Sequence, residues 1–124
     1  PGSFARLHKA WQAGDTITLQ LDMRIHARRQ NGYLAFRRGP IQLAADARIQ
    51  DPDEPVSVRL DAEGYVRDSS LMKDSGLRDD IPFPHAIGVA ITQTDGRSLR
   101  LTDYASAGKT WKEDSATAAW IPEK

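Results

Sequence analysis

The sequence predicts an all-β fold: a jelly-roll-like antiparallel β-sandwich with one long loop around residues 61–81. Apolar and polar residues alternate in about seven short segments, a period of two that is typical of strands with one buried face. Turn-forming residues separate these segments, and no stretch has helical periodicity. Short strands divided by turn signals are typical of sandwiches rather than of helical or α/β folds.

The first predicted strand covers residues 16–27. Its apolar residues occupy every second position: Ile17, Leu19, Leu21, Met23 and Ile25. Helical spacing cannot produce this pattern, so we expect these side chains on the buried face of a sheet. His26 falls on the polar face, where we expect contact with solvent rather than with a metal.

Two hairpins are predicted from their turns. Asn31–Gly32 suits a two-residue type I′ turn, because both central residues must accept a positive φ. That turn pairs residues whose numbers sum to 63. For the second hairpin, a three-residue loop at Thr94–Gly96 pairs Ile91 with Leu99 and gathers the apolar residues on one face. A two-residue Asp-Gly turn would place them on opposite faces.

The remaining strands are predicted from shorter alternating segments. Gly39–Pro40 interrupts the ladder, because proline donates no hydrogen bond, and residues 41–45 resume as a strand redirected across the core. Residues 56–60 alternate again, and a last strand covers residues 118–121. The long loop around 61–81 lacks periodicity, and we expect one helical turn within it near residues 70–73.

The composition excludes several classes of protein. The chain has 124 residues, 17 basic and 17 acidic side chains, and no cysteine. Zero net charge argues against duplex DNA or an anionic membrane as partner. The absence of cysteine removes disulfides, thiolate nucleophiles and cysteine-based zinc sites. No apolar run approaches the roughly 18 residues of a membrane span. We therefore expect a single domain, residues 1–124, with neither a nucleic-acid nor a membrane partner.

The neutral total conceals two segments of opposite charge. Residues 24–38 carry five arginines and no acid, whereas residues 46–80 carry ten acidic and five basic side chains. A basic hairpin can contact nucleic acid, but only two aromatic residues lie within it. We expect it to face the acidic segment or another domain.

No pattern of catalytic or metal-ligating residues stands out. His8, His26 and His85 are far apart, and the sequence contains neither an HExxH nor a G-x-S-x-G motif. The acidic run over residues 51–54 is interrupted by Pro52 and followed by Pro55, and it lacks the EF-hand pattern. We expect no catalytic residue, no metal and no cofactor in this chain.

The aromatic residues are the candidates for ligand contact. Tyr104 and Trp111 flank a loop of small residues, where an exposed ring can pack on the C–H face of a sugar. With Asp103 they form the set of carbohydrate-contact candidates, and packing in the core remains the alternative. We expect Trp120 in the core, since it alternates with Ala118, and Trp11 anchoring the first turn against the sandwich.

Three motifs in order resemble a known family. They are Trp11-Gln12-Ala13-Gly14-Asp15-Thr16-Ile17 followed by Leu19, Leu21 and Met23; then Arg38-Gly39-Pro40 between apolar strands; and Leu101 to Gly108 followed by Trp111 and Trp120-Ile121-Pro122. This order resembles glycoside hydrolase family 127-type proteins, which are β-L-arabinofuranosidase-like. The chain departs from the family at Asp22, where proline is common.

The resemblance implies an accessory region of a larger enzyme. Such proteins have a large (α/α)6 barrel with the sugar pocket, followed by β-sandwich domains. Their chemistry depends on a cysteine nucleophile and a zinc site rich in Cys and Glu, and none of these residues can be carried over to a chain without cysteine.

Three functions are therefore considered. The first is a non-catalytic accessory domain, a fragment of a glycosidase, that packs against the catalytic barrel and borders its cleft. The second is an independent carbohydrate-binding module. The third is a free-standing interaction domain whose basic hairpin binds an acidic partner.

Overall fold

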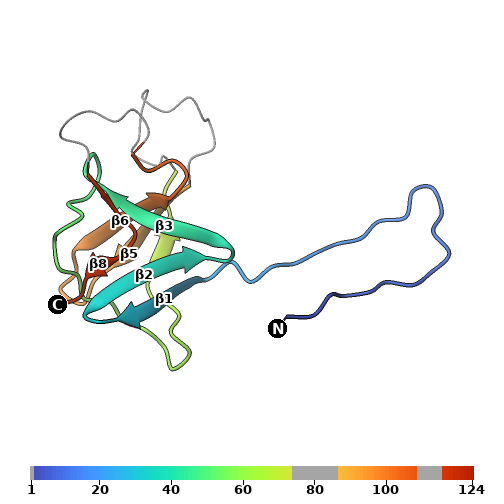
Figure 1. Cartoon of the computed structure of the whole chain (residues 1–124), viewed down its shortest axis with the longest axis horizontal. Coiled ribbons are helices and arrows are strands. Elements are labelled where there is room, and N and C mark those ends of the chain that lie inside the picture. Colours follow the sequence, from blue (N-terminus) through green and yellow to red (C-terminus); the bar gives the residue numbers. More distant parts are fainter. Residues whose placement is uncertain (1, 74–86, 109–115) are drawn as a thin grey trace.

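The computed structural model describes residues 2–73, 87–108 and 116–124, and every regular element in these ranges is a β-strand. The strands are β1 (Ile25–Gln30), β2 (Tyr33–Arg38), β3 (Ile41–Asp46), β4 (Ser69–Leu71), β5 (Gly88–Thr92), β6 (Ser98–Asp103), β7 (Thr117–Ala118) and β8 (Ile121–Pro122). They form one curled antiparallel sheet in the order β1-β2-β3-β6-β5-β4, with β7 paired to β3 and β8 to β2 (Figure 1). The predicted all-β antiparallel fold is confirmed.

Both predicted hairpin registers are confirmed. In the β1–β2 hairpin Ala27 pairs with Phe36, as the sum of 63 requires. Its turn residues Asn31 and Gly32 have φ values of 52° and 79°, which is the left-handed region that a type I′ turn demands. In the β5–β6 hairpin Ile91 pairs with Leu99, so the apolar residues share one face.

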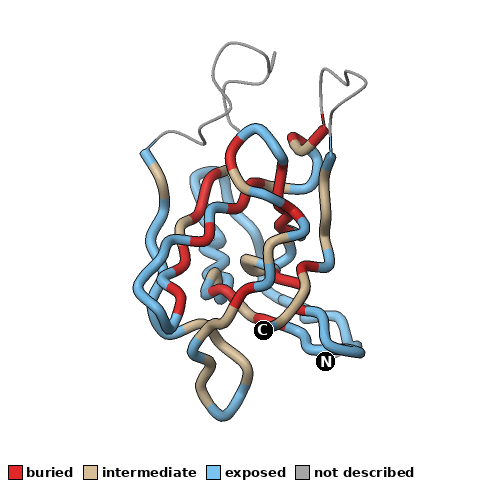
Figure 2. The backbone as a smooth tube through the Cα atoms, turned by 90° about the vertical axis from the view of Figure 1, so that its left-hand side faces the viewer, coloured by how far each residue is buried: buried red, intermediate tan, exposed pale blue. Residues whose placement is uncertain are grey.

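The core lies inside the curl of the sheet. Its largest fully buried side chains are Phe36, Leu34, Leu43, Ile91, Leu99, Leu101 and Ile121, contributed by β2, β3, β5, β6 and β8. In Figure 2 the buried positions, in red, gather in the central part of the fold. Because strand side chains alternate between faces, the same strands present a second set of residues on the outer face. That outer face carries the site described below.

The first strand begins at Ile25, so its predicted start at residue 16 is wrong. Residues 2–24, the N-terminal arm, lie outside the sheet, and all but the last few of them extend away from it (Figure 1). Leu19 is 79% exposed, and Ile17 and Leu21 are exposed as well. The physical reason is the β2–β3 turn: the β1–β2 ladder ends at the pair Ile25–Arg38, and β2 then reverses. Residues before Ile25 therefore have no strand of this sheet to pair with.

The expected anchoring of Trp11 against the sandwich is also wrong. Trp11 lies in the N-terminal arm and is 48% exposed. Its turn is held locally, since the Asp15 amide donates to the Gln12 carbonyl at 3.1 Å. The Lys9 ammonium lies 5.0 Å from the centre of the Trp11 ring.

Residues 56–60 do not form a regular strand. Val56, Val58 and Leu60 each make an isolated bridge, and each has a partner in a different segment. Val56 is buried, as the alternation predicts. The segment is not a regular strand, because no single neighbouring strand runs beside it.

The long loop predicted around residues 61–81 contains a strand. Ser69–Leu71 is β4, paired with β5, so the helical turn expected near residues 70–73 is wrong. Hydrogen bonds to β5 impose the extended conformation here despite the lack of a local pattern. The part of the loop from 74 onward lies outside the described residues.

The last predicted strand is divided in two. β7 pairs with β3, whereas β8 pairs with β2. Ala119 and Trp120 lie between them, outside any strand. Trp120 is 41% exposed, so its expected place in the core is wrong.

Candidate functional site

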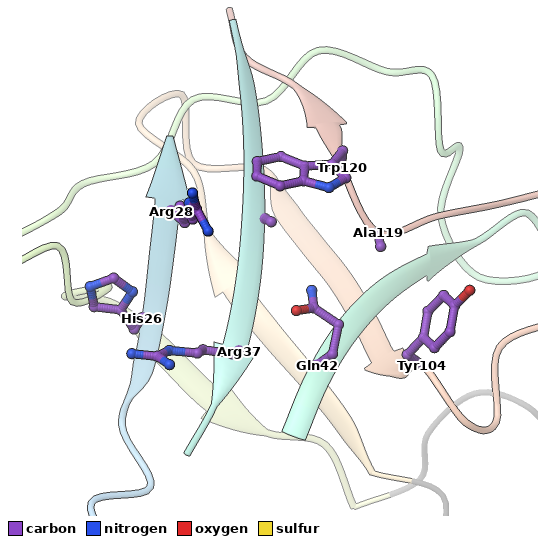
Figure 3. A pocket seen from close by; sticks show the side chains of 8 residues that line it. His26, Arg28, Arg37, Gln42, Tyr104, Ala119 and Trp120 are labelled. Atoms are coloured by element: carbon purple, nitrogen blue, oxygen red, sulfur yellow. The ribbon is translucent and has the colours of Figure 1, made fainter. Parts of the chain in front are cut away.

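An open pocket of about 550 Å³ lies on the outer face of β1, β2 and β3. We call it the sheet-face pocket; Figure 3 shows seven of its lining side chains by name. Its floor is the small side chain of Ala35, which pairs with Arg28 across the β1–β2 ladder. The next pair along the ladder, Ala27–Phe36, points into the core. A small residue at position 35 leaves room for a ligand above the sheet.

One row of lining residues crosses three strands. His26 pairs with Arg37 on β2, and Arg37 pairs with Gln42 on β3. The row continues to Tyr104, whose amide donates to the Gln42 carbonyl at 2.8 Å. The Gln42 side-chain amide donates to the carbonyls of Phe36 at 2.9 Å and Leu43 at 3.0 Å, which fixes its orientation.

Two aromatic rings stand beside this row. Tyr104, immediately after β6, is 58% exposed, and Trp120, between β7 and β8, is 41% exposed. In Figure 3, Trp120, Gln42 and Tyr104 surround one side of the opening, and His26, Arg28 and Arg37 line the other. The pocket therefore offers ring faces, a fixed amide and positive charge to a ligand.

Asp103 holds the start of the loop that carries Tyr104. One of its carboxylate oxygens accepts hydrogen bonds from the Ser106 amide at 2.9 Å and the Ser106 hydroxyl at 2.8 Å. The other accepts from the Ile87 amide at 2.9 Å. Both oxygens are thus engaged by the protein, and Asp103 positions its neighbour Tyr104.

Asp46, at the end of β3, holds Gly108 of the same loop. Its buried carboxylate accepts from the Gly108 amide at 2.9 Å and from the Arg48 guanidinium at 2.6 Å. Burial favours a higher pKa for Asp46, but the Arg48 guanidinium and the Gly108 amide outweigh it and hold the pKa below its ordinary value of 3.8. The loop is thus held at Ser106 by Asp103 and at Gly108 by Asp46.

The structure brings together only part of the predicted candidate set. Tyr104 lines the pocket, Asp103 lies next to it in a supporting position, and Trp111 lies outside the described residues. His26, expected simply to meet solvent, lines the pocket and contacts the Glu63 carbonyl through its Nε2 at 3.1 Å.

Sequence reasoning did not select Arg28, Arg37, Gln42 or Trp120 as site residues. The Asn31–Gly32 turn register contains a signal for part of this set, because it places His26 opposite Arg37. Nothing local places Trp120 above them, since β8 reaches β2 from the far end of the chain.

The described residues that line the pocket are aromatic, amide, basic or small, and none of them is an Asp or Glu. In the described ranges no three His, Asp or Glu side chains gather as a metal site. No helix found among these residues is long and apolar enough to cross a membrane.

No family model, curated protein or solved structure matches the chain.

Proposed function

We propose that this chain is a non-catalytic β-sandwich accessory domain of a glycoside hydrolase, and that its sheet-face pocket contacts sugar. The observation that carries the proposal is the pair of exposed rings, Tyr104 and Trp120, beside a pocket of about 550 Å³. Exposed aromatic rings next to a few fixed polar groups are a common feature of ligand sites. The resemblance to glycoside hydrolase family 127-type proteins supports the same class of ligand.

In this role the domain packs against the (α/α)6 catalytic barrel of a parent enzyme and borders its cleft. The sugar rings lie against Tyr104 or Trp120, and Gln42 accepts hydrogen bonds from hydroxyl groups through its side-chain oxygen. In this proposal the catalytic residues all belong to the barrel. The accessory domain contributes affinity and position.

Calorimetric titration with arabinose-containing oligosaccharides tests the sugar contact. We expect a Kd near the millimolar range, which corresponds to about −4 kcal/mol. Tyr104→Ala and Trp120→Ala should each weaken binding by roughly threefold to tenfold, because an aromatic contact contributes about 0.5–1.5 kcal/mol beyond its buried area. Trp11→Ala is the matched control, since Trp11 is 48% exposed but lies in the N-terminal arm.

Unaltered binding by Tyr104→Ala and Trp120→Ala would disprove the assignment of the pocket. Deletion of the domain from the parent enzyme tests the supporting role: turnover and thermal stability should both fall. If both stay unchanged after deletion, the domain does not support the barrel.

An independent carbohydrate-binding module is the second candidate. It is favoured by the exposure of two rings at the pocket, Tyr104 at 58% and Trp120 at 41%. An independent module should bind the oligosaccharide equally well with and without the barrel. A cleft-bordering domain should instead bind measurably tighter when the barrel is present.

A further inference from the structure

Positive charge is concentrated on one wall of the sheet-face pocket. His26, Arg28 and Arg37 line it, and none of the lining residues in the described part of the chain is acidic. An anionic group entering the pocket would therefore meet two guanidinium groups and no carboxylate from the described lining residues. Charge of one sign in a concave site attracts ligands of the other sign.

Two neighbouring arginines, Arg24 and Arg29, are paired within the protein. Arg24 binds Asp22, with Nη2 to Oδ2 at 2.7 Å, and Arg29 binds Glu123, with Nε to Oε2 at 2.6 Å. By contrast, Arg28 and Arg37 have neither an ion pair nor a side-chain hydrogen bond with any residue in the described ranges. Arg38 likewise has no partner among the described residues, but it does not line the pocket, whereas Arg28 and Arg37 do.

The register places these two arginines at a spacing that suits a shared ligand. Arg28 pairs with Ala35, and Arg37 lies two residues further along β2, so the arginines are diagonal neighbours on one face. Diagonal neighbours in a sheet lie roughly 7–8 Å apart at their Cα atoms. Two like charges at this spacing repel each other, and an anion held between them removes that repulsion.

We propose that the sheet-face pocket selects an acidic saccharide, whose carboxylate binds Arg28 and Arg37 while its ring lies against Tyr104 or Trp120. A uronic acid unit carries this combination of a sugar ring and a planar carboxylate. Guanidinium groups match the geometry of a carboxylate with paired hydrogen bonds. This inference rests on the proposed function, because it assigns the ligand class of the same pocket.

The test compares three probes by calorimetry: trigalacturonate, its neutral counterpart galactotriose, and inorganic phosphate. Trigalacturonate should bind at least tenfold more tightly than galactotriose, since hydrogen bonds to charged groups contribute about 1.5–3 kcal/mol. The preference should shrink at high salt. Inorganic phosphate should bind more weakly than trigalacturonate, because it has no ring for the aromatic residues.

Variants assign the effect to the two arginines. Arg28→Gln and Arg37→Gln should each weaken trigalacturonate binding about tenfold and leave galactotriose binding unchanged. Arg29→Gln is the matched control, because Arg29 belongs to the same strand but is paired with Glu123 rather than directed to the pocket. It should bind both sugars as the wild-type chain does. Circular dichroism confirms that each variant is folded.

The outcomes separate the two proposals. Equal binding of the acidic and neutral sugars overturns the selection of an acidic saccharide but leaves the sugar-binding function standing. Binding of neither sugar overturns the selection of an acidic saccharide, and it overturns the sugar-binding function as well if arabinose-containing oligosaccharides do not bind either. If inorganic phosphate binds as tightly as trigalacturonate and depends on the same arginines, the pocket is an anion site and the saccharide assignment is overturned.

Discussion

Replacement of Asp46 by alanine is expected to lower the free energy of unfolding by about 2–4 kcal/mol and to loosen the loop that carries Tyr104. Asp46 is the buried acceptor that joins the end of β3 to this loop, through the Gly108 amide. It also holds Arg48, whose amide and guanidinium donate to the same carboxylate. One substitution therefore removes both attachments.

The magnitude follows from those two attachments. A buried amide left without an acceptor costs about 1–3 kcal/mol, and this applies to Gly108. The Arg48 side chain is 27% exposed, so its guanidinium can turn toward water when Asp46 is removed. Loss of the Arg48–Asp46 ion pair therefore adds only about 1 kcal/mol. Asp46→Asn keeps one oxygen for the Gly108 amide and loses the charge, so it should cost only about 1 kcal/mol.

Urea denaturation of the purified chain measures both variants, with Asp53→Ala as the matched control because Asp53 is exposed. The difference between wild type and Asp46→Asn should also depend on pH. The folded-state pKa of Asp46 lies below its ordinary value of 3.8, so its stabilisation is fully present above that pH. It should disappear as the pH falls through the lowered folded-state pKa.

An Asp46→Ala variant as stable as Asp53→Ala would refute this reasoning. So would a difference between wild type and Asp46→Asn that grows as the pH falls below 3.8. If the Asp46→Ala variant, which still contains Tyr104, loses sugar binding, the loop held by Asp46 positions the Tyr104 ring.

Other predictions test the backbone, the core and the N-terminal arm. Gly64→Ala should lower stability more than Gly96→Ala. Both glycines have a positive φ, which costs an alanine about 1–2 kcal/mol. Only at Gly64 does the new Cβ also meet a pocket residue, since His26 Nε2 lies 2.9 Å from it. Thermal unfolding measures this order, and equal costs would contradict it. Phe36→Ala should lose about 3–5 kcal/mol in denaturant titration, because Phe36 is 1% exposed in the core. Deletion of residues 2–21 should change stability by less than about 1 kcal/mol and reduce concentration-dependent association in light scattering, since this arm exposes its apolar residues. A large loss of stability would show that the arm packs on the domain.

The two hairpins could be predicted because their determinants are local. Asn31–Gly32 accepts the positive φ of a type I′ turn, and that turn sets every pair of the ladder beyond it. In the second hairpin only one loop length gathers Ile91 and Leu99 on a common face. Turn geometry and alternation restrict the same register independently, so the two constraints agree.

The site could be predicted only in part. Tyr104 was identifiable as an exposed ring beside a loop of small residues, and the His26–Arg37 pair follows from the first turn. Tyr104 lies near Gln42 because β6 pairs with β3. Trp120 lies near both residues because β8 pairs with β2. Contacts between segments that are far apart in the chain have no local signal.

In the N-terminal arm the alternation of apolar residues does not predict the structure. Residues 16–24 alternate as regularly as β1, yet only β1 is a strand. The sequence alone determined which side chains would share a face and how each hairpin would be paired. Tertiary structure decided which alternating segments became strands, because a strand requires hydrogen bonds from a neighbour, and β2 turns into β3 before it can pair with the arm.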